Sequence, residues 1–411
     1  MKRDRRSLTN VGGQVDVGGA QDEGDRLARA LDVPPPPPRS DRASEGDERA
    51  HVHGFHAYPA RMHPVTASRL LEAFAPVGGV VLDPFCGSGT VLVESMLLGR
   101  PAVGTDLNPI AIALSRLKTR PRAPGELEAL VSAAHTIAEF AGERRKARAG
   151  ATRRYPPEDT EIFDPHVLLE LDGLRHGIAT LYQGDLREDL LLVLSAILVK
   201  VSKKESDTVA RAEPKRIAAG YPARLFVKKT EELAARLGEL EARLPSPRPS
   251  ARLYLNDATR LDALASDSVD AIVTSPPYVA TYDYLAHHAL RLRWLGMDAR
   301  AFESDELGAR RRYATLGPDA AWSRWSEELH ALLTAAARVA RPGAPVILLM
   351  ADSAVGDQAL PADEIVADVA SHTSLVCVAR ASQVRPHFHQ ETQDAFRTRP
   401  RAEHALLLRK R

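Results

Sequence analysis

Residues 80–90 read Val80-Val81-Leu82-Asp83-Pro84-Phe85-Cys86-Gly87-Ser88-Gly89-Thr90, and this stretch predicts the fold. Its apolar start predicts a buried strand, its glycines predict a tight turn, and the apolar residues 91–98 predict a helix. Gly87 and Gly89 would let the backbone pass close to a ligand, which the amides at the start of the helix would face. A strand, a glycine turn and a helix in this order are typical of an α/β fold.

The next predicted strand, residues 102–105, is followed by Asp106. An acidic residue at this place can accept hydrogen bonds from a ribose diol, as in dinucleotide-binding folds. The turn at Gly87 nevertheless lacks the G-x-G-x-x-G spacing of the dinucleotide fingerprint. It also begins with Asp83, which would repel a pyrophosphate and attract an ammonium or sulfonium group. We therefore expect a nucleoside ligand that carries a positive charge.

A second informative segment, Thr274-Ser275-Pro276-Pro277-Tyr278, follows the apolar residues 269–273. Each proline forces an extended conformation on the residue before it, and neither can donate to a strand ladder. The segment therefore predicts a rigid lip at the end of a buried strand. Such a lip suits a planar ring with an exocyclic amine. The alternative is a proline turn closed by a packed tyrosine.

Together these segments resemble the S-adenosylmethionine-dependent DNA amino-methyltransferases, and most of all their cytosine-N4-specific members. In that family Asp-Pro-Phe-x-Gly-Ser-Gly-Thr is the cofactor loop and Ser/Asp/Asn-Pro-Pro-Tyr is the catalytic motif. Residues 58–61, 256–258 and 281–296 match further family segments. The resemblance covers residues 51–120 and 250–411.

The resemblance implies an α/β fold with a mainly parallel, seven-stranded Rossmann-like sheet, helices on both faces and an antiparallel final hairpin. It implies S-adenosylmethionine as the cofactor and DNA as the partner. The implied cofactor-binding residues are Tyr58, Asp83, Phe85, Gly87, Ser88, Gly89, Thr90, Asp106, Asn108 and Asp257. The implied catalytic residues are Ser275, Pro276, Pro277 and Tyr278. A cognate restriction endonuclease is a candidate second partner.

The chemistry explains why these residue types are needed. The lone pair of an exocyclic base amine is conjugated with the ring, and two acceptors on its hydrogens would free it. The Ser275 side chain and the Pro276 carbonyl are the expected acceptors, and Tyr278 would stack on the base. A base inside a duplex must first be flipped into the pocket. No covalent nucleophile is required, so Cys86 is interpreted as a packing residue.

Serine at position 275 favours cytosine-N4 methylation of DNA. Adenine-N6 methylation, methylation of an RNA base amine, and a non-catalytic nucleic-acid-binding protein remain open alternatives. The cofactor loop precedes the catalytic motif, an order that resembles the alpha arrangement of the family and that slightly weakens the cytosine assignment. Target recognition would then fall in the segment between the two motifs.

Composition agrees with an intracellular enzyme. The chain of 411 residues has a formal net charge of +1, so affinity for nucleic acid must come from local patches. Two cysteines provide no disulfide framework, and no apolar run reaches the roughly twenty residues that span a bilayer. The basic start lacks the apolar stretch of a secretory signal. We expect a cytoplasmic protein, whose oligomeric state the sequence leaves open.

The chain is predicted to have four parts. Residues 1–50 read as a disordered tail with a proline run, Pro34 to Pro38, because few residues there could form a core. Residues 51–120 and 251–411 form the two halves of the methyltransferase domain. Residues 121–250 are a mostly helical, basic insertion, in which a target-recognition function is expected.

Two groups of charged or titratable residues complete the prediction. Residues 200–229 carry a net charge of +6, and Lys203, Lys204, Lys215 and Arg216 are expected to contact phosphates. The alternative is a solvated helical face. The histidines His51, His53, His56 and His63 match no zinc-binding spacing, so surface or hydrogen-bonding roles and no metal site are expected.

Overall fold

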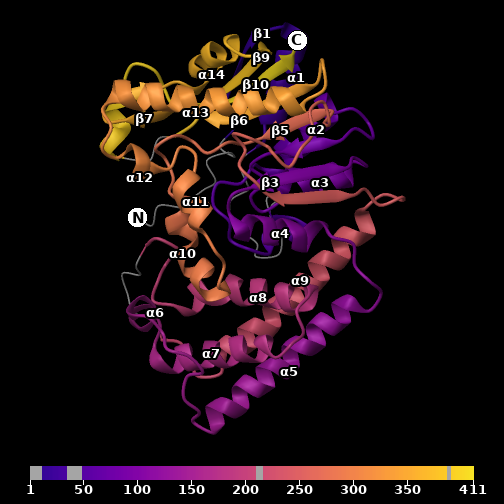
Figure 1. Ribbon diagram of the computed structural model, residues 1–411, viewed down its shortest axis with the longest axis vertical. Coiled ribbons are helices and arrows are strands. Elements are labelled where there is room, and N and C mark those ends of the chain that lie inside the picture. The colour runs from indigo at the N-terminus through magenta and orange to yellow at the C-terminus, as the bar shows by residue number, and fades with distance from the viewer. Residues whose placement is uncertain (1–11, 35–48, 210–215, 387–389) are drawn as a thin grey trace.

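A computed structural model describes residues 12–34, 49–209, 216–386 and 390–411. Its centre is an eight-stranded sheet (Figure 1) with the strand order β1-β9-β10-β6-β5-β2-β3-β4. The strands are β1 (Val15–Gly19), β2 (Val81–Asp83), β3 (Ala102–Asp106), β4 (Ala251–Leu255), β5 (Ala271–Thr274), β6 (Pro345–Ala351), β9 (Leu375–Val384) and β10 (Ala402–Lys410).

Five strands, from β4 to β6, run parallel, and the sheet continues with antiparallel strands. β2 lies between β3 and β5, and Leu82 pairs with Val103 on one side and Ile272 on the other. β10 runs antiparallel to both β6 and β9. The expected mainly parallel α/β sheet with an antiparallel final hairpin is confirmed, and its seven strands are joined by an eighth.

The eighth strand, β1, corrects the prediction of a disordered tail over residues 1–50. β1 runs antiparallel to β9, and Val17 pairs with Ala381. Helix α1 (Gln21–Leu31) follows and buries Leu27 and Leu31 completely or almost so. The prediction is wrong for residues 12–34. The strand with the alternating valines, β1, pairs with β9 at the edge of the sheet, and the two leucines of α1 are buried. Residues 1–11 and 35–48 of the proposed tail, which include Pro35 to Pro38, lie outside the described residues.

Helices cover both faces of the sheet because successive residues of each buried strand point to opposite sides. Leu82, Ile272 and Leu348 pack in one core cluster with residues of α13 (Pro318–Val339). Val81, Val273 and Ile347 pack in another with residues of α2 (Pro64–Phe74). The remaining helices next to the sheet are α3 (Thr90–Leu97), α4 (Pro109–Thr119) and α14 (Ala362–Ser371).

The segment between the two motifs is helical, and its core continues to Ile110 and Leu114 of α4. Leu130, Leu171, Leu194 and Leu237, each from a different helix, are fully buried in one cluster. The helices are α5 (Glu126–Lys146), α6 (Pro157–Ile162), α7 (Pro165–Ala179), α8 (Asp185–Leu198), η3 (Val199–Val201) and α9 (Tyr221–Arg243). Figure 1 shows them as a separate layer on the α4 side of the sheet.

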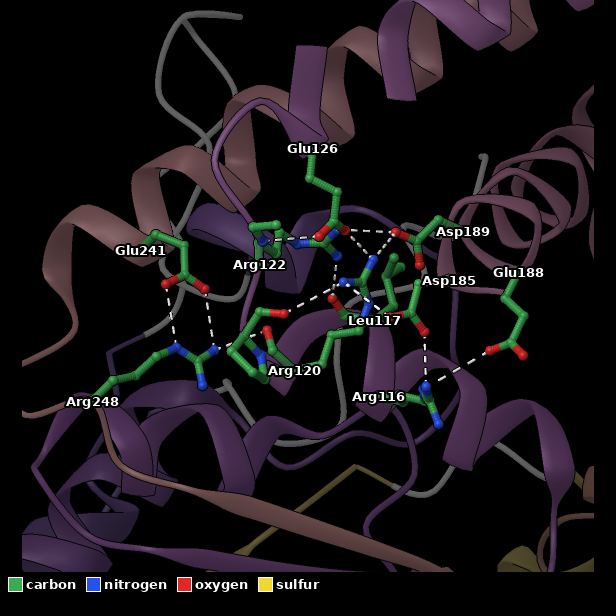
Figure 2. A network of polar contacts seen from close by, with 12 residues as sticks. Arg116, Leu117, Arg120, Arg122, Glu126, Asp185, Glu188, Asp189, Glu241 and Arg248 are labelled. Atoms are coloured by element: carbon green, nitrogen blue, oxygen red, sulfur yellow. Dashed lines mark hydrogen bonds and ion pairs between the residues drawn. The ribbon is translucent and has the colours of Figure 1, made fainter. Parts of the chain in front are cut away.

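A network of ion pairs joins this layer to the end of α4 (Figure 2). Arg120 and Arg122, which follow α4, donate to the same oxygen of Asp189 in α8 at 2.7 and 3.0 Å. Both also pair with Glu126 at the start of α5. The Asp189 side chain is only 4% exposed, so these contacts are largely shielded from water.

Three short helices follow β5: α10 (Tyr284–Leu295), α11 (Arg300–Asp305) and α12 (Arg310–Tyr313). A small hairpin, β7 (Ser353–Val355) and β8 (Gln358–Leu360), lies outside the main sheet, and η2 (His51–Gly54) and η4 (Gln390–Phe396) are single 3₁₀ segments. Within the described part of the chain, every helix is too short or too polar to cross a membrane.

Candidate active site

A cleft opens where β2, β3 and β5 end. These strands are parallel neighbours, so their carboxyl ends meet at one edge of the sheet, where open α/β sheets bind ligands. The predicted residues that line this cleft are Tyr58, Asp83, Phe85, Gly87, Ser88, Thr90, Asp106, Asn108, Asp257, Ser275 and Pro277. Gly89, Pro276 and Tyr278 are not among its lining residues.

The glycine turn between β2 and α3 has a backbone that other residues would strain. Gly87 and Gly89 have φ angles of 49° and 84°, in the left-handed region. A Cβ atom on Gly87 would lie 3.1 Å from the Tyr58 ring, and one on Gly89 would lie 2.9 Å from Ser115 Oγ. The turn therefore needs glycine at both positions.

Asp83 is the acid at the bottom of the cleft. Its Oδ1 atom accepts hydrogen bonds from Thr274 Oγ1 at 2.6 Å and from the Phe85 amide at 3.1 Å. Burial raises the pKa of Asp83 from 3.8 to about 7, although both hydrogen bonds oppose this shift. A positive charge in the cleft would favour the ionised form of this carboxyl.

Asp106, at the end of β3, lies beside the turn. One of its oxygens accepts the Gly87 amide at 3.0 Å and the other accepts the Asn108 amide at 2.8 Å. Each carboxylate oxygen has a second lone pair, so Asp106 can still accept bonds from a diol. Burial raises its pKa to about 6. Asn108 caps α4 through its side-chain oxygen and donates to the Tyr58 hydroxyl at 3.4 Å.

Two buried polar atoms of the cleft have no hydrogen-bond partner among the described residues, Ser88 Oγ and Asn256 Oδ1. A buried polar group without a partner is costly, and a polar ligand would remove that cost. With the charges of Asp83 and Asp106, these atoms fit a nucleoside that bears a cation. Asp257, next to Asn256, accepts two bonds from Thr259, from its amide at 2.8 Å and its hydroxyl at 2.7 Å.

Sequence reasoning missed several lining residues. They are Ala60, Arg61, Met62, Pro84, Cys86, Val91, Leu107, Asn256, Ala258, Thr259, Tyr284, Phe302, Asp305, Glu306 and Leu307. Those from α11 and the residues after it had no motif to mark them, because they reach the cleft only through the chain's path after β5, whereas Tyr284 stood in the quoted family segment 281–296. Asn256 stood in a quoted family segment and could have been chosen for its amide. Burial raises the pKa of the Cys86 thiol, which favours its protonated form.

The lip begins at Thr274, the last residue of β5. Ser275 and Pro277 face the cleft, whereas Tyr278 is 8% exposed and packs in the core cluster that includes α13 residues. The Tyr278 hydroxyl donates to Glu403 Oε1 at 2.8 Å. Burial, and then the Glu403 carboxylate, raise the pKa of Tyr278 well above its usual value. The stacking of this ring on a base stays a prediction.

The four histidines are buried, so the expectation of surface roles is wrong. Three of them instead make side-chain hydrogen bonds, the other expected role. His53 contacts Glu94 at 2.8 Å, His56 contacts Ser195 at 2.9 Å, and His63 accepts the Val65 amide at the start of α2. Among the residues that the structure describes, two groups have ligand atoms close enough to hold a metal ion: His51, His53 and Glu94, and Asp352, Asp363 and His404. The carboxylate oxygens of Asp352 already accept backbone amides from Ala362 and Ala402.

The basic residues of the insertion lie outside the residues that line the cleft. Lys203 is half-exposed, donates to the Glu161 carbonyl at 3.1 Å and lies 3.5 Å from Asp164. Lys204 is partly buried and donates to the Asp207 carbonyl at 3.1 Å. Arg216 is exposed, and Lys215 lies outside the described residues. Contact with phosphates stays a prediction for all four.

Comparisons with known proteins agree on a family. Residues 35–116 match the N6/N4 family model described as DNA methylase. The type II methyltransferase M.MvaI of Kocuria varians is 26% identical over 60% of this chain and 58% of its own. The type II methyltransferase M.BsoBI of Geobacillus stearothermophilus is 25% identical over 62% of this chain and 55% of its own. The chain thus spans little more than half the length of these relatives.

A solved structure, TrmN from Thermus thermophilus, aligns with 86% of this chain and 50% of its own at 12% identity. Its TM-score of 0.34 is too low to carry an argument. The family-model match and the two relatives support the DNA amino-methyltransferase family of the N4/N6 type for this chain.

Proposed function

We propose that this protein transfers the methyl group of S-adenosylmethionine to the exocyclic N4 amine of cytosine in DNA, at a specific site and on a flipped-out base. The observation that carries the proposal is that Ser275 lines the same cleft as Asp83 and Asp106. A methyl donor held by the two acids would therefore meet a base amine at the lip.

The predicted cofactor-binding residues would each contact a different part of S-adenosylmethionine. Asp83 and Gly87 would hold the methionine part, where the raised pKa of Asp83 marks a site that a positive charge would stabilise. Asp106 would accept the ribose hydroxyls. Asp257 and the unpartnered oxygen of Asn256 would lie near the adenine. The cofactor supplies an activated methyl group, so much of the remaining catalysis is positioning.

The target amine would be held by two acceptors of the lip, the Ser275 side chain and the Pro276 carbonyl. Serine at this position supports cytosine over adenine. The motif order, with the cofactor loop first, slightly weakens the cytosine assignment and is the reason to test both bases.

The test is to incubate the purified protein and S-adenosylmethionine with unmethylated plasmid, digest the DNA to nucleosides and separate the products by mass. N4-methylcytosine is the expected product, and it should be absent with the Ser275→Ala variant. N6-methyladenine alone would reject the base assignment but keep the enzyme class. Transfer to RNA alone would reject DNA as the substrate. Binding without any transfer would reject the activity.

The chain would act with DNA as its macromolecular partner, and a cognate restriction endonuclease is a further proposed partner, suggested by the type II methyltransferases among its relatives. Within the chain, residues 51–120 and 251–411 would form the catalytic domain. Residues 121–250 would recognise the target sequence.

A further inference from the structure

The glycine turn between β2 and α3 is held by side chains of helix α4. Ser115 and Lys118 stand three positions apart in α4, so both lie on the same side of the helix. Ser115 Oγ donates to the Gly87 carbonyl at 3.0 Å, and Lys118 Nζ donates to the Ser88 carbonyl at 2.6 Å. Two side chains of one helix therefore bind two successive carbonyls of the turn.

Stability alone gives no reason for a lysine at position 118. Lys118 is only 1% exposed, and burial lowers its pKa well below the usual value. Among the residues that the structure describes, the Ser88 carbonyl is its one hydrogen-bond acceptor, and no carboxylate pairs with it. A buried amine without a counter-charge costs folding free energy. What the lysine adds in return is its bond to the turn.

These bonds determine which groups of the turn can meet a ligand. The Gly87 carbonyl points at Ser115, and in a trans peptide the following amide, that of Ser88, points the opposite way. Within the described part of the chain this amide has no acceptor, and the Ser88 hydroxyl in the cleft has no partner either. Because glycine adopts many backbone conformations, the turn needs contacts from outside to keep this peptide from rotating.

We propose that Ser115 and Lys118 are positioning residues for S-adenosylmethionine: they hold the two carbonyls of the turn against α4, so that the Ser88 amide and hydroxyl face the ligand. Neither of them lines the cleft, so they act through the turn and not by contact with the cofactor. This inference rests on the proposed placement of the cofactor at the glycine turn, and it adds two residues that belong to neither motif.

The experiment measures the affinity of the purified protein for S-adenosylmethionine by calorimetry. Ser115→Ala should weaken binding about fivefold, because one net hydrogen bond favours the binding conformation of the turn by about that factor. Lys118→Met should weaken it about tenfold, since a hydrogen bond from a charged donor is stronger. The rate of methyl transfer at saturating S-adenosylmethionine should change less than twofold, because the lip is untouched.

The melting temperature separates positioning from a structural role. Lys118→Met fills the same space and removes a buried amine, so it should keep or raise the melting temperature while it weakens cofactor binding. A residue that served the fold alone would lower both together. Ser115→Ala, a smaller change, tests the same turn through the other carbonyl.

Thr119 offers a matched control on the same helix. It is 2% exposed and does not line the cleft, and its hydroxyl donates to the Ser115 carbonyl within α4 at 2.8 Å. Thr119→Val removes this bond without touching the turn. It should leave the affinity for S-adenosylmethionine unchanged.

Two outcomes would overturn the inference: parental affinity in Ser115→Ala and Lys118→Met, or an equal loss of affinity in Thr119→Val. Failure of the proposed function would look different. In that case the unchanged protein would bind S-adenosylmethionine and form no methylated base, while calorimetry would still show the effect of Ser115 and Lys118.

Discussion

We expect the charge state of Asp83 to govern the binding of a cation in the cleft, which this residue lines. Its pKa is raised to about 7, mainly by burial, and Asp106 behind it is raised to about 6 for the same reason. Without ligand, an appreciable fraction of Asp83 is therefore neutral at pH 7. The sulfonium and ammonium groups of S-adenosylmethionine interact favourably only with the ionised form, so binding and deprotonation are linked.

The affinity for S-adenosylmethionine should therefore rise with pH. Between pH 6 and pH 8 the ionised fraction of a carboxyl of pKa about 7 rises about tenfold, and the association constant should follow it. Asp106 adds to the change in the same direction near pH 6. Calorimetry at pH 6, 7 and 8 measures this dependence. The Asp83→Asn variant, which cannot ionise at this position, should bind S-adenosylmethionine more weakly and lose most of the pH dependence.

Glu94 provides a matched control for this experiment. Burial also raises its pKa to about 7, but it contacts His53 and does not line the cleft. Glu94→Gln should keep the pH dependence of cofactor affinity. If Asp83→Asn retains the full dependence and Glu94→Gln loses it, the cation does not interact with Asp83.

The site was predictable at the residue scale only where its residues stand in local motifs. Asp83, Gly87, Asp106 and Ser275 are each read from a strand and the turn after it. Glu403 could not be found in this way, because its contact with Tyr278 exists only once β10, β6 and β5 are assembled. The same holds for Phe302, which reaches the cleft from the chain after β5 without a motif of its own.

At the scale of elements, β2, β3 and β5 were predictable because each begins with a run of apolar residues before a turn, and the closing hairpin was implied by the family resemblance. β1 and α1 were not predictable in this way. Residues 1–50 are polar on average, and this average gives no sign of one short amphipathic helix. Leu27 and Leu31 lie on the buried side of α1, and Leu27 is 0% exposed.

α1 should therefore contribute measurably to stability. Leu27→Ala should lower the free energy of unfolding by about 2–5 kcal/mol, the usual cost of a buried leucine truncated to alanine. Arg29→Ala, on the exposed side of the same helix, should change it by less than about 0.5 kcal/mol. Denaturant titrations of both variants give the comparison. Equal, small effects would mean that α1 is not part of the cooperative fold.

At the scale of the whole molecule, the junction between the helical layer and the sheet depends on Asp189 (Figure 2). Its side chain is 4% exposed and accepts from Arg120 and Arg122, which are themselves 9% and 4% exposed. Removing one partner of a buried ion pair leaves the other charges uncompensated. Removing Asp189 should therefore weaken the attachment of α8 to the end of α4.

Asp189→Ala should lower the free energy of unfolding by about 3–5 kcal/mol. Glu188 is the adjacent control: it is 56% exposed and only 3.9 Å from Arg116, so Glu188→Ala should cost less than about 1 kcal/mol. Hydrogen exchange would show whether α5 and α8 lose protection before the sheet does. A loss for Asp189→Ala no larger than that for Glu188→Ala would show that packing alone attaches the layer.

The helical layer is also where DNA contact is predicted, from Lys203, Lys204, Lys215 and Arg216. Each phosphate contact contributes about 0.9 to the slope of log affinity against log salt concentration. Changing all four residues to glutamine should flatten that slope and weaken binding to every DNA sequence about equally. Because Lys203, Lys204 and Arg216 do not line the cleft, the affinity for S-adenosylmethionine should stay the same.

The described contacts sharpen this last prediction. Lys203 lies 3.5 Å from Asp164, and a phosphate must compete with that carboxylate. The Lys203→Gln and Lys204→Gln double variant should therefore flatten the salt slope of DNA binding less than the removal of two cations without acidic neighbours would. Lys146→Gln with Arg243→Gln removes as much charge from exposed sites on α5 and α9, where each cation also has an acidic neighbour. Equal salt slopes for the two double variants would show that net charge, and not this segment, governs DNA binding.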